Sequence, residues 1–166
     1  MASEMRYRTV MSMIGAAQHA TVISREELPS TMSEQRRPRI SVVNDNPDFL
    51  ELMQAILDED AGYDVTLFDG EKTSIAEIAA SDPDLVIVDL VLGGASGWEI
   101  VVLSRADDRL ASLPILVCSA DVAALREKGE ELERIGNVHI LEKPFGIDEI
   151  TDIVERLVGI ASPVPS

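Results

Sequence analysis

Five short apolar segments alternate with helical patterns in this sequence. The segments lie at residues 40–43, 63–68, 85–88, 115–118 and 138–141. After each one, apolar residues recur at the three- and four-residue spacing of a helix that faces a core, over residues 49–57, 75–79, 98–105, 122–135 and 147–158. This alternation predicts an α/β domain, a parallel sheet with helices on both faces. The unbroken run at 85–88 is typical of a central strand that is covered on both sides.

Polar side chains come within two residues after four of these expected strands. Asn44 and Asp45 follow the first, Asp89 the third, Ser119 the fourth, and Lys143 the fifth. The carboxyl ends of parallel strands meet at one edge of the sheet, where open α/β sheets bind ligands. Each residue also has an ordinary interpretation: Asp89 could cap a turn, Ser119 a helix, and Lys143 could be a solvated cation. Together they place two carboxylates, a hydroxyl and an ammonium at one edge.

This set of groups suits phosphoryl chemistry. Asp45 and Asp89 match Mg²⁺, which uses one or two carboxylates and completes its shell with water and phosphate oxygens. A carboxylate can also attack a phosphoryl group, while Lys143 and Ser119 stabilise the charge that develops on the phosphoryl oxygens. The stretch after Asp45 has a structural role as well, because Asn46 and Pro47 are suited to the N-cap and first position of a helix.

Charge is unevenly distributed along the chain, whose formal net charge is −16. Residues 1–39 hold six Arg and four Glu (+2), which leaves eight cationic and 26 acidic residues (−18) in the remainder. Such an acidic body disfavours nucleic acid and anionic membranes as partners and favours cations and basic protein surfaces. The single cysteine, Cys118, lies in an apolar run and is interpreted as a buried small residue; the composition fits a reducing, cytoplasmic compartment.

The two ends of the chain carry weaker patterns. Residues 1–39 are expected to form a flexible arm with a short helix between Met5 and Ala20, and Met32 is an alternative start. Polar residues interrupt the apolar stretch at 10–23, so an export signal is not favoured. No run reaches the ~18 apolar residues that a membrane-spanning helix needs. Residues 40–158 are expected to form the domain, and 159–166 a short tail.

Four segments carry a resemblance to a known family. "ISVVNDNPDF", "DLVIVDLVLGGASGWEI", "PILVCSA" and "LEKPF" occur in the order and at the spacings of a response regulator receiver domain of two-component signalling. The likeness spans residues 40–158 and is specific, since Asp89 stands eight residues before Gly97 and "KPF" follows the fifth strand. It implies a doubly wound, flavodoxin-like (βα)5 fold with five parallel strands in the order 2-1-3-4-5.

The resemblance also implies roles for individual residues. Asp89 would be the phospho-acceptor, Lys143 the lysine that pairs with the phosphate, and Ser119 the hydroxyl that moves toward the phosphoryl group. The Lys143–Pro144 peptide bond would be cis, a state that X–Pro bonds permit. The implied Mg²⁺ ligands are Asp45, Asp89 and the backbone carbonyl of Val91.

Three positions depart from the family pattern. Asn44 stands where the family has the first of two adjacent acids; its carbonyl could hold a metal-bound water, and weaker Mg²⁺ affinity with phosphorylation retained is expected. Gly93 replaces a proline, which predicts a looser loop. Ile140 occupies the aromatic switch position, beside His139, which is interpreted as a solvent-facing strand residue. Signal propagation from the site should therefore differ.

The resulting expectation is a single-domain response regulator. It would accept a phosphoryl group from a histidine kinase and act by binding a protein, or pass the group to a histidine phosphotransfer protein. Its only catalysis would be its own phosphorylation and dephosphorylation. Only eight residues follow the last expected helix, which predicts a receiver that stands alone. The surface of the fourth helix, fifth strand and fifth helix suggests a partner with a basic patch, because it carries Glu127, Glu130, Glu131, Glu133 and Glu142.

Two alternatives stay open. A pseudo-receiver that binds proteins without phosphorylation is favoured by Asn44 and Ile140. It is opposed by Asp45, Asp89, Ser119 and Lys143. A nucleotide- or flavin-binding enzyme is opposed by the stretch "NDNPDF", which offers acids and a proline where such enzymes have a phosphate-cradling glycine loop.

Overall fold

A computed structural model describes residues 36–92 and 96–161 of the chain, with side chains through residue 159. Several expectations lie outside the described residues: the short helix at 5–20, the alternative start at Met32, the loop at Gly93, and the tail from residue 162 onward. Within the described ranges, none of the helices has the length and apolar character that spanning a bilayer requires.

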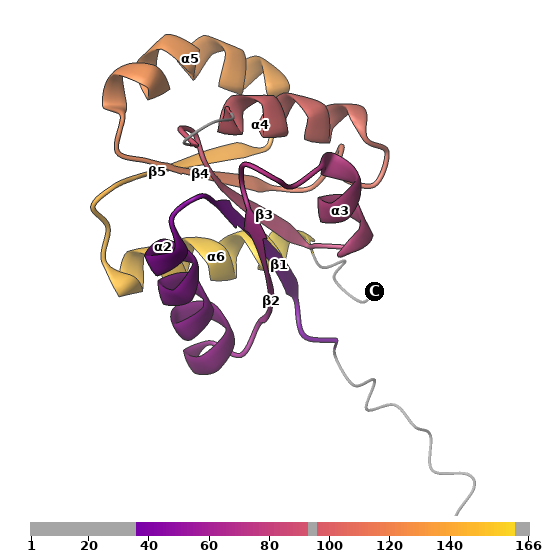
Figure 1. Ribbon diagram of the computed structural model, residues 1–166, viewed down its shortest axis with the longest axis vertical. Helices are drawn as coiled ribbons and strands as arrows, with labels where there is room; N and C mark the ends of the chain where they lie inside the picture. The colour runs from indigo at the N-terminus through magenta and orange to yellow at the C-terminus, as the bar shows by residue number, and fades with distance from the viewer. Residues whose placement is uncertain (1–35, 93–95, 162–166) are drawn as a thin grey trace, which may run out of the picture. The chain divides into compact units, whose positions relative to one another are not determined.

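Five parallel strands form one sheet in the order β2-β1-β3-β4-β5 (Figure 1). The strands are β1 (Arg39–Asn44), β2 (Asp64–Asp69), β3 (Leu85–Asp89), β4 (Ile115–Ser119) and β5 (Val138–Glu142). This order confirms the fold that the sequence implies. The register pairs Val43 with Val88 and Asp89 with Cys118, so the carboxyl ends of β1, β3 and β4 are aligned at one edge.

Helices cover both faces of the sheet, with α3, α4 and α5 on one face and α2 and α6 on the other (Figure 1). The helical segments are α2 (Pro47–Met53), the π-helix η1 (Gln54–Asp60), α3 (Ile75–Ala80), α4 (Gly97–Ala106), α5 (Val122–Ile135) and α6 (Ile147–Ala161). Two apolar cores separate the layers. Strand β3 contributes Ile87 to one core and Val88 to the other, as expected for a strand that is buried on both faces.

The turn between β1 and α2 forms as its residues predict. The side-chain oxygen of Asn46 accepts hydrogen bonds from the backbone N–H groups of Asp48 (2.9 Å) and Phe49 (3.3 Å), and Pro47 is the first helical residue. The helix then widens into the π-helical segment η1 and ends before Gly62. This cap fixes the direction in which the chain leaves β1 and therefore where Asp45 lies.

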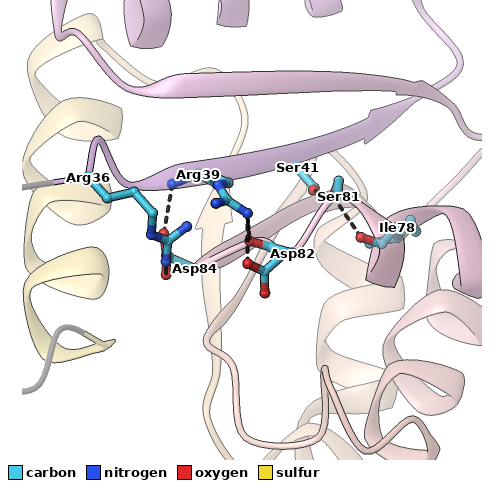
Figure 2. Close-up of polar contacts among 7 residues, drawn as sticks. All are labelled: Arg36, Arg39, Ser41, Ile78, Ser81, Asp82 and Asp84. Carbon is cyan, nitrogen blue, oxygen red and sulfur yellow. Dashed lines mark hydrogen bonds and ion pairs between the residues drawn. The ribbon is translucent and has the colours of Figure 1, made fainter.

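Residues 36–39, assigned above to the flexible arm, instead contact the amino-terminal end of the sheet. Arg36 donates to Asp84 at 2.8 Å, Arg39 pairs with Asp82 at 2.7 Å, and the Arg39 backbone N–H donates to Asp84 at 2.8 Å (Figure 2). Arg37 donates to the carbonyl oxygens of Gly62 and Tyr63. Arg39 is also the first residue of β1. The ordered domain therefore begins before residue 40.

Removing the Asp84 carboxylate should weaken this end of the fold. The Asp84→Ala change deletes acceptors for Arg36 and for the Arg39 backbone, and we expect it to lower the free energy of unfolding by about 1–3 kcal/mol. Part of this loss should vanish at high salt, since the Arg36 pair is half-exposed. Urea denaturation at low and high salt measures the change in unfolding free energy. Asp108→Ala, at an exposed turn, is the control. Equal stability of the two variants would contradict the prediction.

Candidate functional site

Asp89 lies at the carboxyl end of the central strand β3, and its side chain is only 13% exposed. One carboxylate oxygen, Oδ1, accepts a hydrogen bond from the Val91 backbone N–H at 3.0 Å. The other, Oδ2, accepts from Lys143 Nζ at 2.5 Å and from Asn44 Nδ2 at 3.4 Å. Asp89 thus caps the turn that follows β3 through Val91, as one interpretation of the sequence expected. It is also paired with a positive charge, Lys143, from 54 positions away.

Lys143 reaches Asp89 from the loop after β5. Its backbone N–H donates to the Ser119 carbonyl oxygen at 2.9 Å, which continues the pairing of β5 with β4. The bond between Lys143 and Pro144 is cis, as predicted. The Lys143 side chain is 24% exposed, so its ammonium is partly withdrawn from solvent and paired rather than simply solvated.

Asn44 and Asp45 end the neighbouring strand with different surroundings. Asn44 is buried (1% exposed); its Oδ1 accepts from the Asn46 N–H at 2.8 Å while its amide group faces Asp89. Asp45 is exposed at the edge. The β1–β3 register brings Asp45 and Asp89 to the ends of adjacent strands. Val91, two residues beyond Asp89, is 56% exposed and forms an isolated bridge with Ser96.

Ser119 faces the same edge from β4. It is buried (1% exposed), and its hydroxyl oxygen accepts from the Asp121 N–H at 3.1 Å. The cap of α5 is Asp121 rather than Ser119, so Ser119 does not have the capping role considered for it. Ser119 and Asp89 both line a cavity of about 520 Å³, whose walls are Asp89, Val91, Ser119, Ala120, Asp121 and Val122. A ligand in this cavity would meet a carboxylate and a hydroxyl together.

Three further side chains that the sequence singles out lie on β4 and β5. Cys118 is fully buried in β4, and burial raises the pKa of its thiol to about 12, so it is a neutral apolar residue, as interpreted above. On β5, Ile140 is 41% exposed. His139 is half-buried rather than open to solvent, and burial lowers its pKa, with a smaller contribution from Arg156.

The structure therefore gathers Asn44, Asp89, Ser119 and Lys143 within one connected set of contacts, with Asp45 and Val91 beside it. One contact has no local signal in the sequence. Phe49 follows the helical spacing of a core residue, yet its ring lies beneath the ammonium of Lys143. Phe49 differs from an ordinary core aromatic only in its contact with Lys143, which lies 94 residues further along the chain. The spacing of apolar residues cannot predict such a distant contact.

The doubly wound five-stranded sheet and the Asp89–Lys143 pair at its carboxyl edge agree with the family resemblance. The sequence matches the family model for the response regulator receiver domain over residues 40–155, and the chain belongs to this family. It is a receiver domain of the kind found in two-component response regulators.

The chain is also similar to part of several longer curated proteins. The DNA-binding dual master transcriptional regulator RpaA of Synechocystis sp. is 31% identical over 129 residues, covering 77% of this chain and 52% of that protein. The transcriptional regulatory protein FixJ of Bradyrhizobium diazoefficiens is 29% identical over 126 residues, covering 75% and 58%. The chain thus spans about half the length of these relatives, and only 15% of the sensor protein GacS of Pseudomonas syringae.

Solved structures agree with the fold. The chemotaxis protein CheY4 of Vibrio cholerae superposes with a TM-score of 0.66 at 23% identity, over 73% of this chain and 98% of that one. The response regulator TrrA of Thermotoga maritima, solved in complex with Mg²⁺ and BeF, gives a TM-score of 0.61 at 26% identity, over 72% and 98%.

Proposed function

We propose that this chain accepts a phosphoryl group on Asp89 from a histidine kinase in a Mg²⁺-dependent reaction. The observation that carries the proposal is the 2.5 Å contact between Lys143 Nζ and Asp89 Oδ2, at the edge of a cavity that Ser119 also lines. A partly buried carboxylate whose charge partner can move to an incoming phosphoryl oxygen is suited to nucleophilic attack on phosphorus. Family membership supports the same role.

The transfer would be a displacement at phosphorus. An oxygen of the Asp89 carboxylate attacks the phosphorus of a phosphohistidine, a P–O bond forms, and the P–N bond breaks. The imidazole nitrogen leaves with the electron pair and takes a proton from solvent. Lys143 then pairs with a phosphoryl oxygen instead of Asp89, and the Ser119 hydroxyl donates a hydrogen bond to the same group.

The donors at this edge fit Mg²⁺. Asp45 and Asp89 would supply carboxylates and Val91 its backbone carbonyl, a set of hard oxygen ligands that leaves room for water and phosphate oxygens. Asn44 would act through a water molecule. When bound, the cation would neutralise negative charge on the transferring group.

Asn44→Asp tests how this chain handles the cation. The new carboxylate would be buried beside Asp89, so without Mg²⁺ we expect a loss of about 2 kcal/mol or more in unfolding free energy. Added Mg²⁺ should restore stability, with an affinity at least about ten-fold higher than that of the native chain. Thermal unfolding against Mg²⁺ concentration measures both effects. Asn46→Asp is the matched control, since Asp caps a helix as well as Asn does; identical Mg²⁺ curves for the two variants would exclude a metal site at Asn44.

Intact-protein mass spectrometry after incubation with acetyl phosphate and Mg²⁺ tests the function directly. We expect a single phosphoryl adduct on the native chain, none on Asp89→Asn, and none when the metal is chelated. No adduct on folded native protein would favour the second candidate, a pseudo-receiver that binds proteins without phosphorylation. The uncharged Asn44 at the site and the exposed Ile140 on β5 are the observations behind that candidate.

The output is proposed to be a protein contact or a phosphorelay step. We place the receiver, from the arginines at the start of β1 through α6, in the cytoplasm. The glutamates of α5 would favour a downstream protein, or a histidine phosphotransfer protein, with a basic surface. Nucleic acid and membrane are not proposed as partners because the domain is strongly acidic.

A further inference from the structure

Lys143 touches an aromatic ring as well as Asp89. Its Nζ lies 4.2 Å from the centre of the Phe49 ring, within the range at which an ammonium is attracted by the negative face of an aromatic ring. Phe49 in turn meets Phe145 edge-on, with 6.4 Å between ring centres and an interplanar angle of 83°. The ammonium is thus held between a carboxylate and a ring that a second ring supports.

Phe49 is itself rigidly held. It is the third residue of α2, and its backbone N–H donates to the capping side chain of Asn46 at 3.3 Å. Its half-buried side chain packs against the core between the sheet and the helices α2 and α6. These contacts restrict the rotamers of Phe49, so its ring keeps the same face toward Lys143.

The two partners of Lys143 would behave differently during phosphoryl transfer. When Asp89 becomes an acyl phosphate, its carboxylate charge is consumed and Lys143 must turn to a phosphoryl oxygen. The attraction of the Phe49 face does not depend on the state of Asp89, so it persists through that change. It also adds no negative charge to a site that already holds Asp45 and Asp89.

We propose that Phe49 is a positioning residue for phosphoryl acceptance, because it holds the Lys143 ammonium over the site while Asp89 reacts. This inference rests on the proposed function. Loss of the ring face should slow formation of the adduct by about three- to thirty-fold, the range that a partly desolvated cation–π contact supports. Phe49→Tyr, which keeps a ring face, should retain most of the rate.

The kinetic test compares adduct formation with acetyl phosphate and Mg²⁺ in Phe49→Leu, Phe49→Tyr and the native chain. Phe49→Leu should be the slow variant, and its effect should disappear in a Lys143→Met background, since no ammonium remains to be held. Leu50→Ala, a loss of half-buried packing on the same helix, is the control for a general loosening of α2. An equal slowing by Phe49→Leu with and without Lys143 would show a purely structural role and overturn the proposal.

A spectroscopic test does not depend on phosphorylation. The chain has three lysines, Lys72, Lys128 and Lys143, so their side-chain NMR signals can be assigned by single substitutions. The ε-methylene protons of Lys143 should be shifted upfield by the Phe49 ring, and this shift should be lost in Phe49→Leu and kept in Phe49→Tyr. An unshifted Lys143 signal in the native chain would overturn the contact.

The kinetic test separates this inference from the proposed function. If the native chain forms no adduct, the proposed function fails. If the native chain forms the adduct and Phe49→Leu forms it at the same rate, only this inference fails.

Discussion

Replacing Lys143 by methionine is expected to slow formation of the Asp89 phosphoryl adduct by about 100-fold or more. Lys143 Nζ is the charged partner of Asp89 Oδ2, and removal of one preorganised donor to developing charge typically lowers rates by about 10²–10³. At an effective dielectric constant near 20, a unit charge pair about 4 Å apart is worth roughly 4 kcal/mol, which is sufficient for such an effect. Methionine retains a long apolar side chain that can still lie against Phe49.

The fold should survive this change, because Asp89 keeps its contacts with the Val91 N–H and the Asn44 amide. Lys128→Met is the matched control. Lys128 also pairs with an acid, Glu131, at 3.3 Å and lies 4.8 Å from the centre of the Trp98 ring, but it belongs to α5. Time courses of the adduct by mass spectrometry, with unfolding curves for each variant, measure the effect. Equal rates for the two variants would make the Asp89–Lys143 pair a structural contact only.

The sheet and most of the site could be predicted because both follow from local patterns. Alternating strand and helix signals imply parallel strands, and parallel strands bring the residues after them to one edge. That rule placed Asp89, Ser119 and Lys143 together without any knowledge of their contacts. The observed strands extend one residue further at the carboxyl end, through Asn44 and Glu142 for example, because backbone pairing continues under polar side chains that a hydropathy pattern assigns to loops.

The contacts that could not be predicted join residues far apart in the chain. Arg36 and Arg39 find acids more than 40 positions away, so a basic stretch that resembles a solvated arm becomes part of the fold. The π-helical turn at Gln54–Asp60 is also hidden, since apolar spacing does not distinguish a wide turn from a regular one. The contact of Phe49 with Lys143 forms only because the folded sheet brings the loop after β5 next to α2.

Gly97→Ala is expected to lower the free energy of unfolding by about 3 kcal/mol or more. The eight-residue spacing from Asp89 brings Gly97 against the backbone of Asp89, where a side chain does not fit. Gly97 begins α4, and its N–H donates to the Leu90 carbonyl at 3.1 Å. A Cβ here would lie 1.7 Å from the backbone oxygen of Asp89 and 3.0 Å from the Leu90 Cα. No side chain can rotate to relieve a clash with backbone, so the helix or the end of β3 must move.

The same displacement should reach Asp89, the proposed phospho-acceptor, because the clashing oxygen is its own backbone carbonyl. We therefore expect any folded Gly97→Ala protein to form the phosphoryl adduct more slowly, in addition to its loss of stability in urea denaturation. Gly129→Ala is the control: Gly129 lies inside α5 with no atom within 4 Å of an added Cβ, so alanine there should be neutral or stabilise by up to about 1 kcal/mol. Native-like stability of Gly97→Ala would mean that α4 can move away from β3 freely, and the glycine would then have no steric role at the site.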